Sequence, residues 1–335
     1  MDVRFSAEQD ALRASAAQVL DRWGPKAVGQ LADIERAQKL DAAIEASGWR
    51  HLRVADEDGT PVASGVEGAI LAEELGRGLA DAPFLGPTLA AELRRLAGAP
   101  AAQARETVLL APGLAGPASQ PDGGVAIDAY GSNSALMLTA GSGGYQLCEI
   151  AIKAGEELSD LTRPGAMAVG LAIPLVDAAR QVTEDDLDSW TALGLALTCA
   201  DLVGAMRGTL ELATAYAGSR KQYGTAIGSF QAVQHLLADA LVAIEGSRSV
   251  ALHAAWAVDA VPPSEALFAA SVAKAYCARA ARTVCETAIQ VHGGIGNTWE
   301  CMAHVYLRRS LLSCDTLGGS GPNLTRVLLH EGIRR

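Results

Sequence analysis

Long apolar repeats with a helical period fill the C-terminal half of the chain, and they constrain the fold more than any other feature. The first runs from about Ser189 to Gln222, and its apolar residues share one helical face: Leu193, Leu197, Ala200, Val203, Met206 and Leu210. Three more runs follow, at about Phe230–Val258, at Ser264–Val291 and from Trp299 towards Cys314. Helices of roughly 25–30 residues with apolar faces predict an antiparallel four-helix bundle.

The ends of these runs carry helix start and stop signals. Asp188 or Ser189 is the expected N-cap of the first helix, because a short polar side chain can accept hydrogen bonds from the free N–H groups there. The second run stops before Pro262-Pro263, and the third ends at Gly293-Gly294. We therefore expect the bundle to span residues 188–335.

The chain before residue 188 divides into a helical part and a β part. Four shorter helical runs precede residue 105: one capped by Ser6 that reaches Trp23, and others at 30–47, Val66–Leu79 and Thr88–Leu96. Short apolar runs follow between Gly, Pro, Ser and Asp residues, at Thr107–Leu110, Gly124–Ile127, Ala135–Thr139 and Tyr145–Ile150. The predicted fold is α+β and mainly helical, with an N-terminal helical domain (1–105), a small middle β domain (106–187) and the C-terminal bundle (188–335).

Charge and cysteine usage exclude several classes of protein. A net charge of −11 argues against nucleic acid as the main partner. No run of 18 apolar residues lacks a charge, so we expect no membrane span, and the polar N-terminus is unlike a signal peptide. The six cysteines form no CxxC pair, which favours reduced thiols in a cytoplasmic protein and argues against a metal site.

Two segments at the ends of the long helices resemble a known family. The first reads Arg220-Lys-Gln-Tyr-Gly-Thr-Ala-Ile-Gly-Ser-Phe-Gln231, and the second reads Gln290-Val-His-Gly-Gly-Ile-Gly296. With Ala72-Glu-Glu-Leu-Gly-Arg77 and the order of helical, β and helical regions, they resemble the acyl-CoA dehydrogenase family. The resemblance covers nearly the whole chain and is strongest over residues 200–310. It implies FAD as cofactor, an acyl-CoA substrate, and an electron-transfer flavoprotein or similar acceptor.

The resemblance also implies roles for residues in the two segments. Arg220 would pair with the flavin pyrophosphate, although an arginine at a helix end can also simply complement the helix dipole. Gln231 and Gln290 offer amides for adenine or ribose. Gly293 and Gly294 let the backbone approach phosphate, or only end the helix, or both.

Three further residues belong to the predicted cofactor site. Tyr223 and Phe230 either pack beside the flavin or fill the core, and His292 is expected to be a backbone-positioned contact rather than a catalyst. In this family these segments usually serve the flavin held by the neighbouring subunit. The resemblance therefore implies that they reach across a dimer interface.

The catalytic base of the family has no counterpart in this chain. That base is a Glu just before a Gly-Thr or Gly-Ser pair, and the matching position here is Gly318. Some members carry the Glu earlier, at a position that matches Gly194. Glycine cannot accept a proton, so the nearest substitutes are Asp315, about one helical turn before Gly318, and the more distant Asp201. The Gly/Ser-rich β segment that holds the flavin ring also has no clear match, and about eighty residues is short for that domain.

Three hypotheses follow from this pattern. In the first, the chain is the non-catalytic subunit of a heteromeric FAD-dependent acyl-CoA dehydrogenase, supplying flavin contacts to a homologous subunit that carries the Glu in an α2β2 heterotetramer. In the second, it is a self-sufficient homo-oligomeric enzyme with a displaced base such as Asp315. In the third, it is a non-redox scaffold that binds CoA esters. Heteromeric members act on steroid side chains and other bulky acyl-CoAs, so that substrate class is an expectation of the first hypothesis alone.

Overall fold

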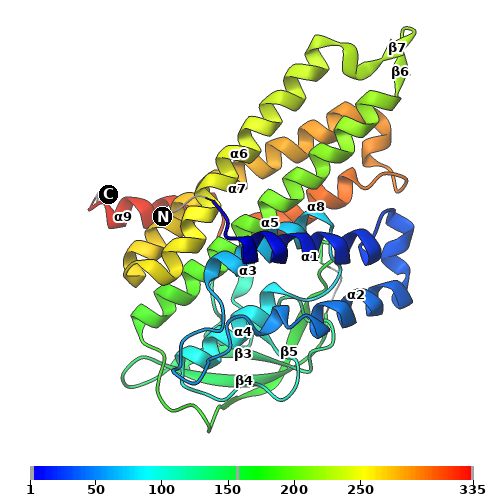
Figure 1. The fold of residues 1–335 in the computed structure, drawn as a ribbon. Helices are drawn as coiled ribbons and strands as arrows, with labels where there is room; N and C mark the ends of the chain where they lie inside the picture. Colours follow the sequence, from blue (N-terminus) through cyan, green and yellow to red (C-terminus); the bar gives the residue numbers. More distant parts are fainter. Residues whose placement is uncertain (1–3, 156–157, 333–335) are drawn as a thin grey trace.

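The computed structural model describes residues 4–155 and 158–332, and it arranges them as N-terminal helices, a small β barrel and a bundle of long helices (Figure 1). The N-terminal part holds four helices and two 3-10 turns: α1 (Ala7–Trp23), η1 (Val28–Ala32), α2 (Ile34–Ala46), η2 (Trp49–His51), α3 (Gly65–Arg77) and α4 (Leu85–Leu96). As predicted, Ser6 caps α1, and it does so in a capping box with Gln9.

Five strands close into a barrel in the order β1-β2-β5-β4-β3. They are β1 (Thr107–Leu110), β2 (Val125–Ala126), β3 (Ser134–Ala140), β4 (Tyr145–Ala154) and β5 (Ala166–Pro174), with a 3-10 turn η3 (Pro112–Leu114) after β1. The β1–β3 pair is parallel and the other pairs are antiparallel. Buried residues such as Leu109, Met137 and Ile150 form a hydrophobic cluster of the barrel's own.

Five α-helices form most of the rest of the described chain. They are α5 (Glu184–Ser219), α6 (Gln231–Ala260), α7 (Pro263–His292), α8 (Ala303–Asp315) and α9 (Ser320–His330). Between α5 and α6 lie the hairpin β6 (Lys221–Gln222) and β7 (Thr225–Ala226) and the 3-10 turn η4 (Ile227–Ser229), and η5 (Gly293–Asn297) follows α7. The predicted mainly helical α+β class with a C-terminal bundle is confirmed, while the division into three domains stays a prediction.

The bounds of one predicted helix are wrong, and two elements were not predicted. The first long helix begins five residues earlier than expected, because Thr183 caps it in a capping box with Asp186, and it ends at Ser219 because the chain turns into the hairpin. Strand β5 was missed because its alternation is interrupted by Gly170 at positive φ. Helix α9 was also missed; its first turn contains Gly321 and Pro322, residue types that often mark turns.

Helix α5 is the centre of the fold. Its residues from Trp190 to Met206 are buried all the way around, and they join one hydrophobic core with residues of α3, α4 and the barrel. By length and composition alone, α5 would be long and apolar enough to cross a membrane, but 94% of its apolar 18-residue window is buried inside the protein. This is the behaviour of the core helix of a globular protein.

Helices α3 and α5 cross with almost no side chain between them. Gly204 of α5 faces the backbone of α3, and a Cβ built on Gly204 would overlap the carbonyl oxygen of Glu73. Gly76 of α3 likewise faces the carbonyl group of Asp201 on α5. The crossing therefore depends on glycine at these positions.

We expect Gly204→Ala to destabilise the protein by about 1–3 kcal/mol, because the added methyl group forces the two backbones apart. Gly218→Ala is the matched control, since Gly218 lies on the same helix with open space around its Cα. That change should leave the protein unaltered or stabilise it by about 0.5–1 kcal/mol. Urea unfolding of both variants measures the difference, and equal stabilities would contradict the tight crossing.

Candidate functional site

One end of the bundle brings the two sequence segments together. Residues from α5 and α7 pack there with the segment that begins α6, in a small hydrophobic cluster: Ala213, Ala217, Ile227, Val233, Leu237, Ala288 and Val291. The rings of Tyr216 and His292 stack across the same end, with centroids 4.6 Å apart. The hairpin β6–β7 forms the tip of the molecule beyond this cluster (Figure 1).

Three polar side chains at this end lack partners within the described residues. Arg220, Gln231 and Gln290 are exposed, and none of their side chains makes a hydrogen bond or ion pair with another described residue. Gly293 adopts φ +67° and ψ −146°, and a Cβ on Gly293 or Gly294 would meet nothing within 4 Å. The end thus presents a guanidinium, two amides and bare backbone, which suits a ligand with phosphate and heterocyclic groups.

The three aromatic residues of the predicted cofactor site have different surroundings. Tyr223 is 95% exposed and Phe230 is 37% exposed, so neither fills the core, and their rings meet edge to face at 6.3 Å. Tyr223 also has φ +53°, an uncommon backbone for a side chain of that size. His292 is buried instead, and its Nδ1 lies 2.7 Å from the carbonyl oxygen of Ala288.

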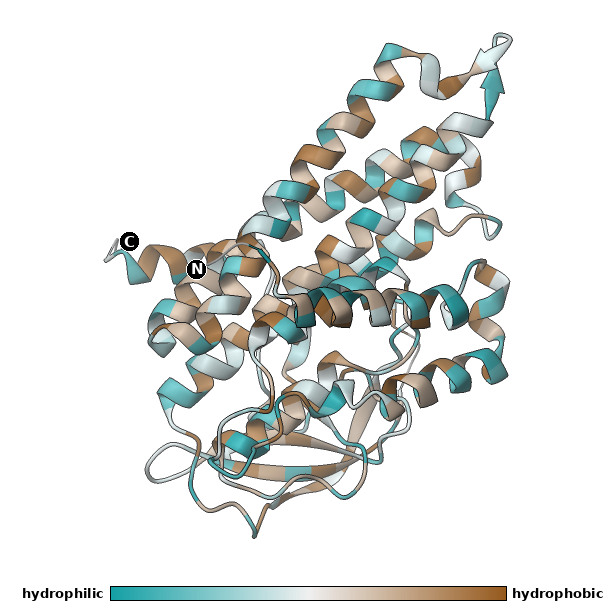
Figure 2. Ribbon diagram, viewed as in Figure 1, coloured by the Kyte–Doolittle hydropathy of each residue, from teal (hydrophilic) through white to brown (hydrophobic). Residues whose placement is uncertain are grey.

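The half of α6 next to this end is largely uncovered. Leu236, Leu241 and Val242 are exposed on it, and apolar bands run along this part of the helix (Figure 2). A helix that projects apolar residues into solvent is typical of a surface that another subunit covers.

The two predicted base positions are linked by Leu317, which precedes Gly318 in the chain and packs against Gly194. Gly194 is on α5, and Gly318 is in the turn between α8 and α9. The fully buried side chain of Leu317 packs directly on Gly194, so that a Cβ at position 194 would overlap its Cδ1. Neither position holds a carboxylate, and in this conformation position 194 has no room for one.

Side chains from two helices donate hydrogen bonds to the backbone of the turn that contains Leu317. The ammonium group of Lys274 on α7 donates to the carbonyl oxygens of Ser313 and Thr316, and burial lowers the pKa of Lys274. Asn323 of α9 donates to the carbonyl oxygens of Gly318 and Gly319, at 2.8 and 3.0 Å. Leu317 itself has φ +60°, a conformation that persists only where its surroundings hold it.

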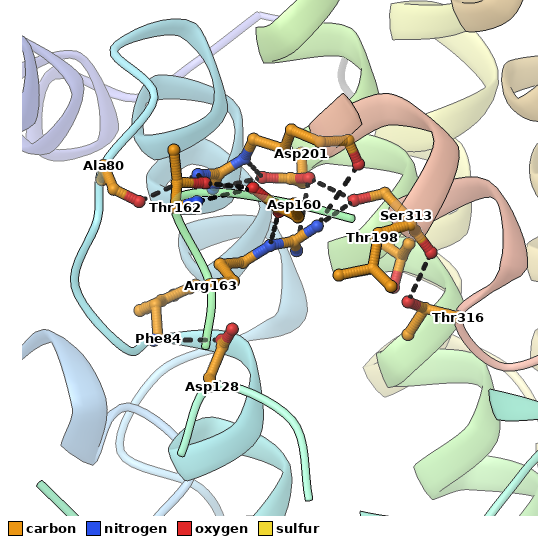
Figure 3. A network of polar contacts seen from close by, with 12 residues as sticks. Ala80, Phe84, Asp128, Asp160, Thr162, Arg163, Thr198, Asp201, Ser313 and Thr316 are labelled. Carbon is orange, nitrogen blue, oxygen red and sulfur yellow. Dashed lines mark hydrogen bonds and ion pairs between the residues drawn. The ribbon is translucent and has the colours of Figure 1, made fainter. Parts of the chain in front are cut away.

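The two substitute carboxylates have different surroundings. Asp315 is exposed at the end of α8, and its carboxylate makes no ion pair with the described residues. Asp201 is buried and bound on both oxygens: Arg309 donates at 2.7 and 2.9 Å, and Ser313 Oγ donates at 2.7 Å (Figure 3). A carboxylate engaged in this way is a structural anchor and has no free oxygen aimed at a substrate.

Asp201 belongs to a buried ionic network that joins four segments of the chain. Arg163, from the loop before β5, lies 3.5 Å from Asp201 and 2.8 Å from Asp160. Arg309 also donates to the carbonyl oxygen of Ala80, just after α3. Burial alone would raise the pKa of Asp201, but the guanidinium groups of Arg309 and Arg163 outweigh it and hold that pKa below its usual value.

Comparison with known proteins identifies the chain. It is 32% identical over 336 residues to the acyl-CoA dehydrogenase IpdE2 of Mycobacterium tuberculosis, and the match covers 96% of each chain. The family profile for the acyl-CoA dehydrogenase C-terminal domain matches residues 193–321. The chain belongs to the acyl-CoA dehydrogenase family. It is also 36% identical to acyl-CoA dehydrogenase FadE34 of M. tuberculosis, over 61% of this chain and only 29% of that longer protein.

Solved structures share the fold of this acyl-CoA dehydrogenase family member at lower identity. A variant of the Tcur3481-Tcur3483 steroid ACAD superposes with a TM-score of 0.80 at 22% identity, covering 97% of this chain and 98% of that one. The ChsE4-ChsE5 complex of M. tuberculosis gives a TM-score of 0.79 at 22% identity over both whole chains. PigA, solved with FAD and proline, gives 0.77 at 17% identity over both whole chains.

Sequence reasoning missed Leu317 and Lys274. A lysine among the alanines and cysteines of the apolar face of α7 was a signal that could have been noticed, because a buried ammonium group needs fixed acceptors. Leu317 gave no such signal, since its role depends on the path of a turn. Among the described residues, no group of three or more His, Cys, Asp or Glu side chains could hold a metal ion.

We expect Asp201→Asn to destabilise the protein by about 3–5 kcal/mol at neutral pH, because it leaves the buried Arg309 without a carboxylate partner, while Arg163 keeps Asp160. The loss in the free energy of unfolding, relative to wild type, should be largest above about pH 3.9, the pKa of an aspartate in the unfolded chain. It should shrink as the pH falls through the lowered pKa of Asp201 in the folded protein. Denaturant unfolding over a pH series measures it.

Asp315→Asn is the matched control for this prediction. Asp315 is exposed and unpaired among the described residues, so its loss should change the stability by less than about 0.5 kcal/mol. Equal effects of the two substitutions would show that the network does not anchor the fold.

Proposed function

We propose that this chain is the supporting subunit of a heteromeric FAD-dependent acyl-CoA dehydrogenase, and that it supplies flavin contacts to a homologous partner carrying the catalytic Glu. The proposal rests on a contrast between the predicted base position, which is filled, and the predicted flavin-contacting side chains, which are exposed. Leu317 fills the space beside Gly194, whereas Arg220, Gln231 and Gln290 are exposed with no partner in the described chain.

The exposed groups fit the phosphate and adenosine parts of FAD. The Arg220 guanidinium can donate two parallel hydrogen bonds to a pyrophosphate and stays charged at any physiological pH. The amides of Gln231 and Gln290 can each donate and accept, as an adenine or ribose requires. The backbone at Gly293 and Gly294 is open to a phosphate, because no Cβ stands in front of it. The stack of His292 on Tyr216, beneath the surface, would fix the position of this turn.

FAD, when bound, supplies the acceptor for the hydride in α,β-desaturation of an acyl-CoA thioester. The residues of this chain would bind and orient the cofactor, and the proton would be taken by a base on the partner. The exposed apolar part of α6, with Leu236, Leu241 and Val242, would be buried by that partner. The fold shared with ChsE4-ChsE5 and with the Tcur3481-Tcur3483 steroid ACAD supports a two-component assembly and a steroid or other bulky acyl-CoA as substrate. A cytoplasmic location and an electron-transfer flavoprotein as acceptor are part of the same proposal.

We expect Arg220→Ala to weaken FAD binding in the purified two-chain complex by about tenfold to a hundredfold, because it removes a charge-assisted pair. The complex would be made by co-expression with a homologue from the same genome that carries the Glu. Flavin released on dilution, followed by its absorbance and fluorescence, measures the change.

Arg22→Ala is the control, since Arg22 is another exposed arginine at a helix end but lies at the end of α1. It should leave flavin retention unchanged. An Arg220→Ala complex that retains FAD as the wild type does would contradict the proposal. A lone chain that turns over acyl-CoA and loses this activity in Asp315→Asn would instead establish the homo-oligomeric alternative.

A further inference from the structure

A cavity lies between the C-terminal half of α4, the turn η2 and the segment 99–106 that leads into β1. Its volume of about 290 Å³ is at the lower limit of the roughly 300–1,000 Å³ that small-molecule sites usually have. Every residue of the segment 99–106 lines the cavity, so this segment forms one of its walls. None of the described residues that line it belongs to the flavin-contacting segments 220–231 and 290–296, so the cavity is a separate place in the molecule.

Positive charge gathers on the lining of this cavity. Four arginines line it, and their side chains are 4% to 18% exposed: Arg50, Arg94, Arg95 and Arg105. Two carboxylates, those of Glu45 and Glu106, are among the described lining residues. The other carboxylates that pair with the four arginines, those of Asp41 and Glu92, lie outside the lining. In a chain with a net charge of −11, a cavity lined in this way is a local exception that favours an anion.

The guanidinium groups keep hydrogen-bond donors in reserve. Arg94 donates to both oxygens of Glu106 and to the carbonyl oxygen of Pro100. Arg95 donates to both oxygens of Glu92 and to the carbonyl oxygen of Gly59. A guanidinium has five N–H donors, so these hydrogen bonds leave about two on each arginine without an acceptor among the described residues. Such donors suit the oxygens of a carboxylate or phosphate.

The four arginines form two groups. Arg94 and Arg95 are neighbours near the end of α4, whereas Arg50 and Arg105 are joined by the carboxylates that they share. Apolar side chains line the same cavity: Val54, Ala55, Pro87, Ala91 and Ala99. Two cationic groups and apolar walls match a ligand that carries two acidic groups on a short carbon chain.

Glu45 is a built-in competitor for such a ligand. Its carboxylate accepts a hydrogen bond from Arg50 at 2.7 Å and another from Arg105 at 3.3 Å. The side chain of Glu45 is 48% exposed, so it can swing into solvent at little cost. A free carboxylate that entered the cavity would take over the donors that Glu45 now uses.

We propose that this cavity binds a short dicarboxylate. One carboxylate would pair with Arg94 and Arg95, and the other would displace Glu45 from Arg50 and Arg105. The carbon chain between them would lie against the apolar part of the lining. Because the ligand would bind only the folded chain, it would also stabilise the N-terminal helical part by mass action. The site goes beyond the proposed function and does not depend on it.

The test is calorimetric titration of the full chain with succinate, acetate and inorganic phosphate. Succinate should bind more tightly than the other two, because it alone has two separate carboxylates on a carbon chain. Arg95→Gln and Arg105→Gln should each weaken succinate binding by about tenfold, since each removes one charge-assisted pair. Both variants should fold, because Glu92 keeps Arg53, and Asp41 and Glu45 keep Arg50.

A third variant should change the affinity in the opposite direction. Glu45→Gln should tighten succinate binding by about threefold to tenfold, because it removes the competing carboxylate, and impaired folding could not produce such a gain. The matched controls are Arg282→Gln and Glu286→Gln, which break an exposed ion pair on α7. Neither control should alter succinate binding.

Three results would overturn the proposal. The first is succinate that binds no more tightly than acetate or phosphate. The second is succinate that binds equally well to wild type, Arg95→Gln and Arg105→Gln, and the third is a Glu45→Gln variant with unchanged or weaker affinity. Failure of the supporting-subunit role would appear separately, as an Arg220→Ala complex that keeps its flavin.

Discussion

The buried ion pair between Asp201 and Arg309 is the point at which the parts of this chain meet. It joins α5 to α8, and through Arg163 and the carbonyl oxygen of Ala80 it reaches the loop before β5 and the segment after α3. Taking such charges out of water is costly, so each oxygen and guanidinium must be matched, and here they are. The position of α8 fixed in this way also sets where the following turn runs.

The turn between α8 and α9 determines where Leu317 packs. Lys274 and Asn323 donate hydrogen bonds to its carbonyl oxygens, and Leu317 packs onto Gly194, one of the two positions at which the sequence predicted a base. At the far end of α5 the arrangement is the opposite, because Arg220 and the glycines after α7 face outward. One helix therefore runs from a filled space beside Gly194 to an end with exposed polar groups, and that contrast is the basis of the proposed supporting-subunit role.

The sequence was a good guide wherever local chemistry decided the structure. The helical periods of α5, α6 and α7, the Ser6 cap and the Gly293 stop all predict elements that the structure contains. It was a poor guide where distant segments meet. The packing of Leu317 on Gly194 depends on a turn path that no local pattern encodes, and strand β5 is specified by its pairing with β2 and β4 rather than by its own alternation. Whether Tyr223 fills the core or faces outward also depends on the path of the chain, and the structure leaves its side chain 95% exposed.

The stoichiometry of flavin tests the central claim most directly. The two-chain complex should contain one FAD for each pair of chains. This chain purified alone should contain none, because its β domain has no clear match to the Gly/Ser-rich segment that holds the flavin ring. Quantitation of released flavin against protein concentration gives both values. Two FAD molecules per pair, or stoichiometric FAD in the lone chain, would contradict the account.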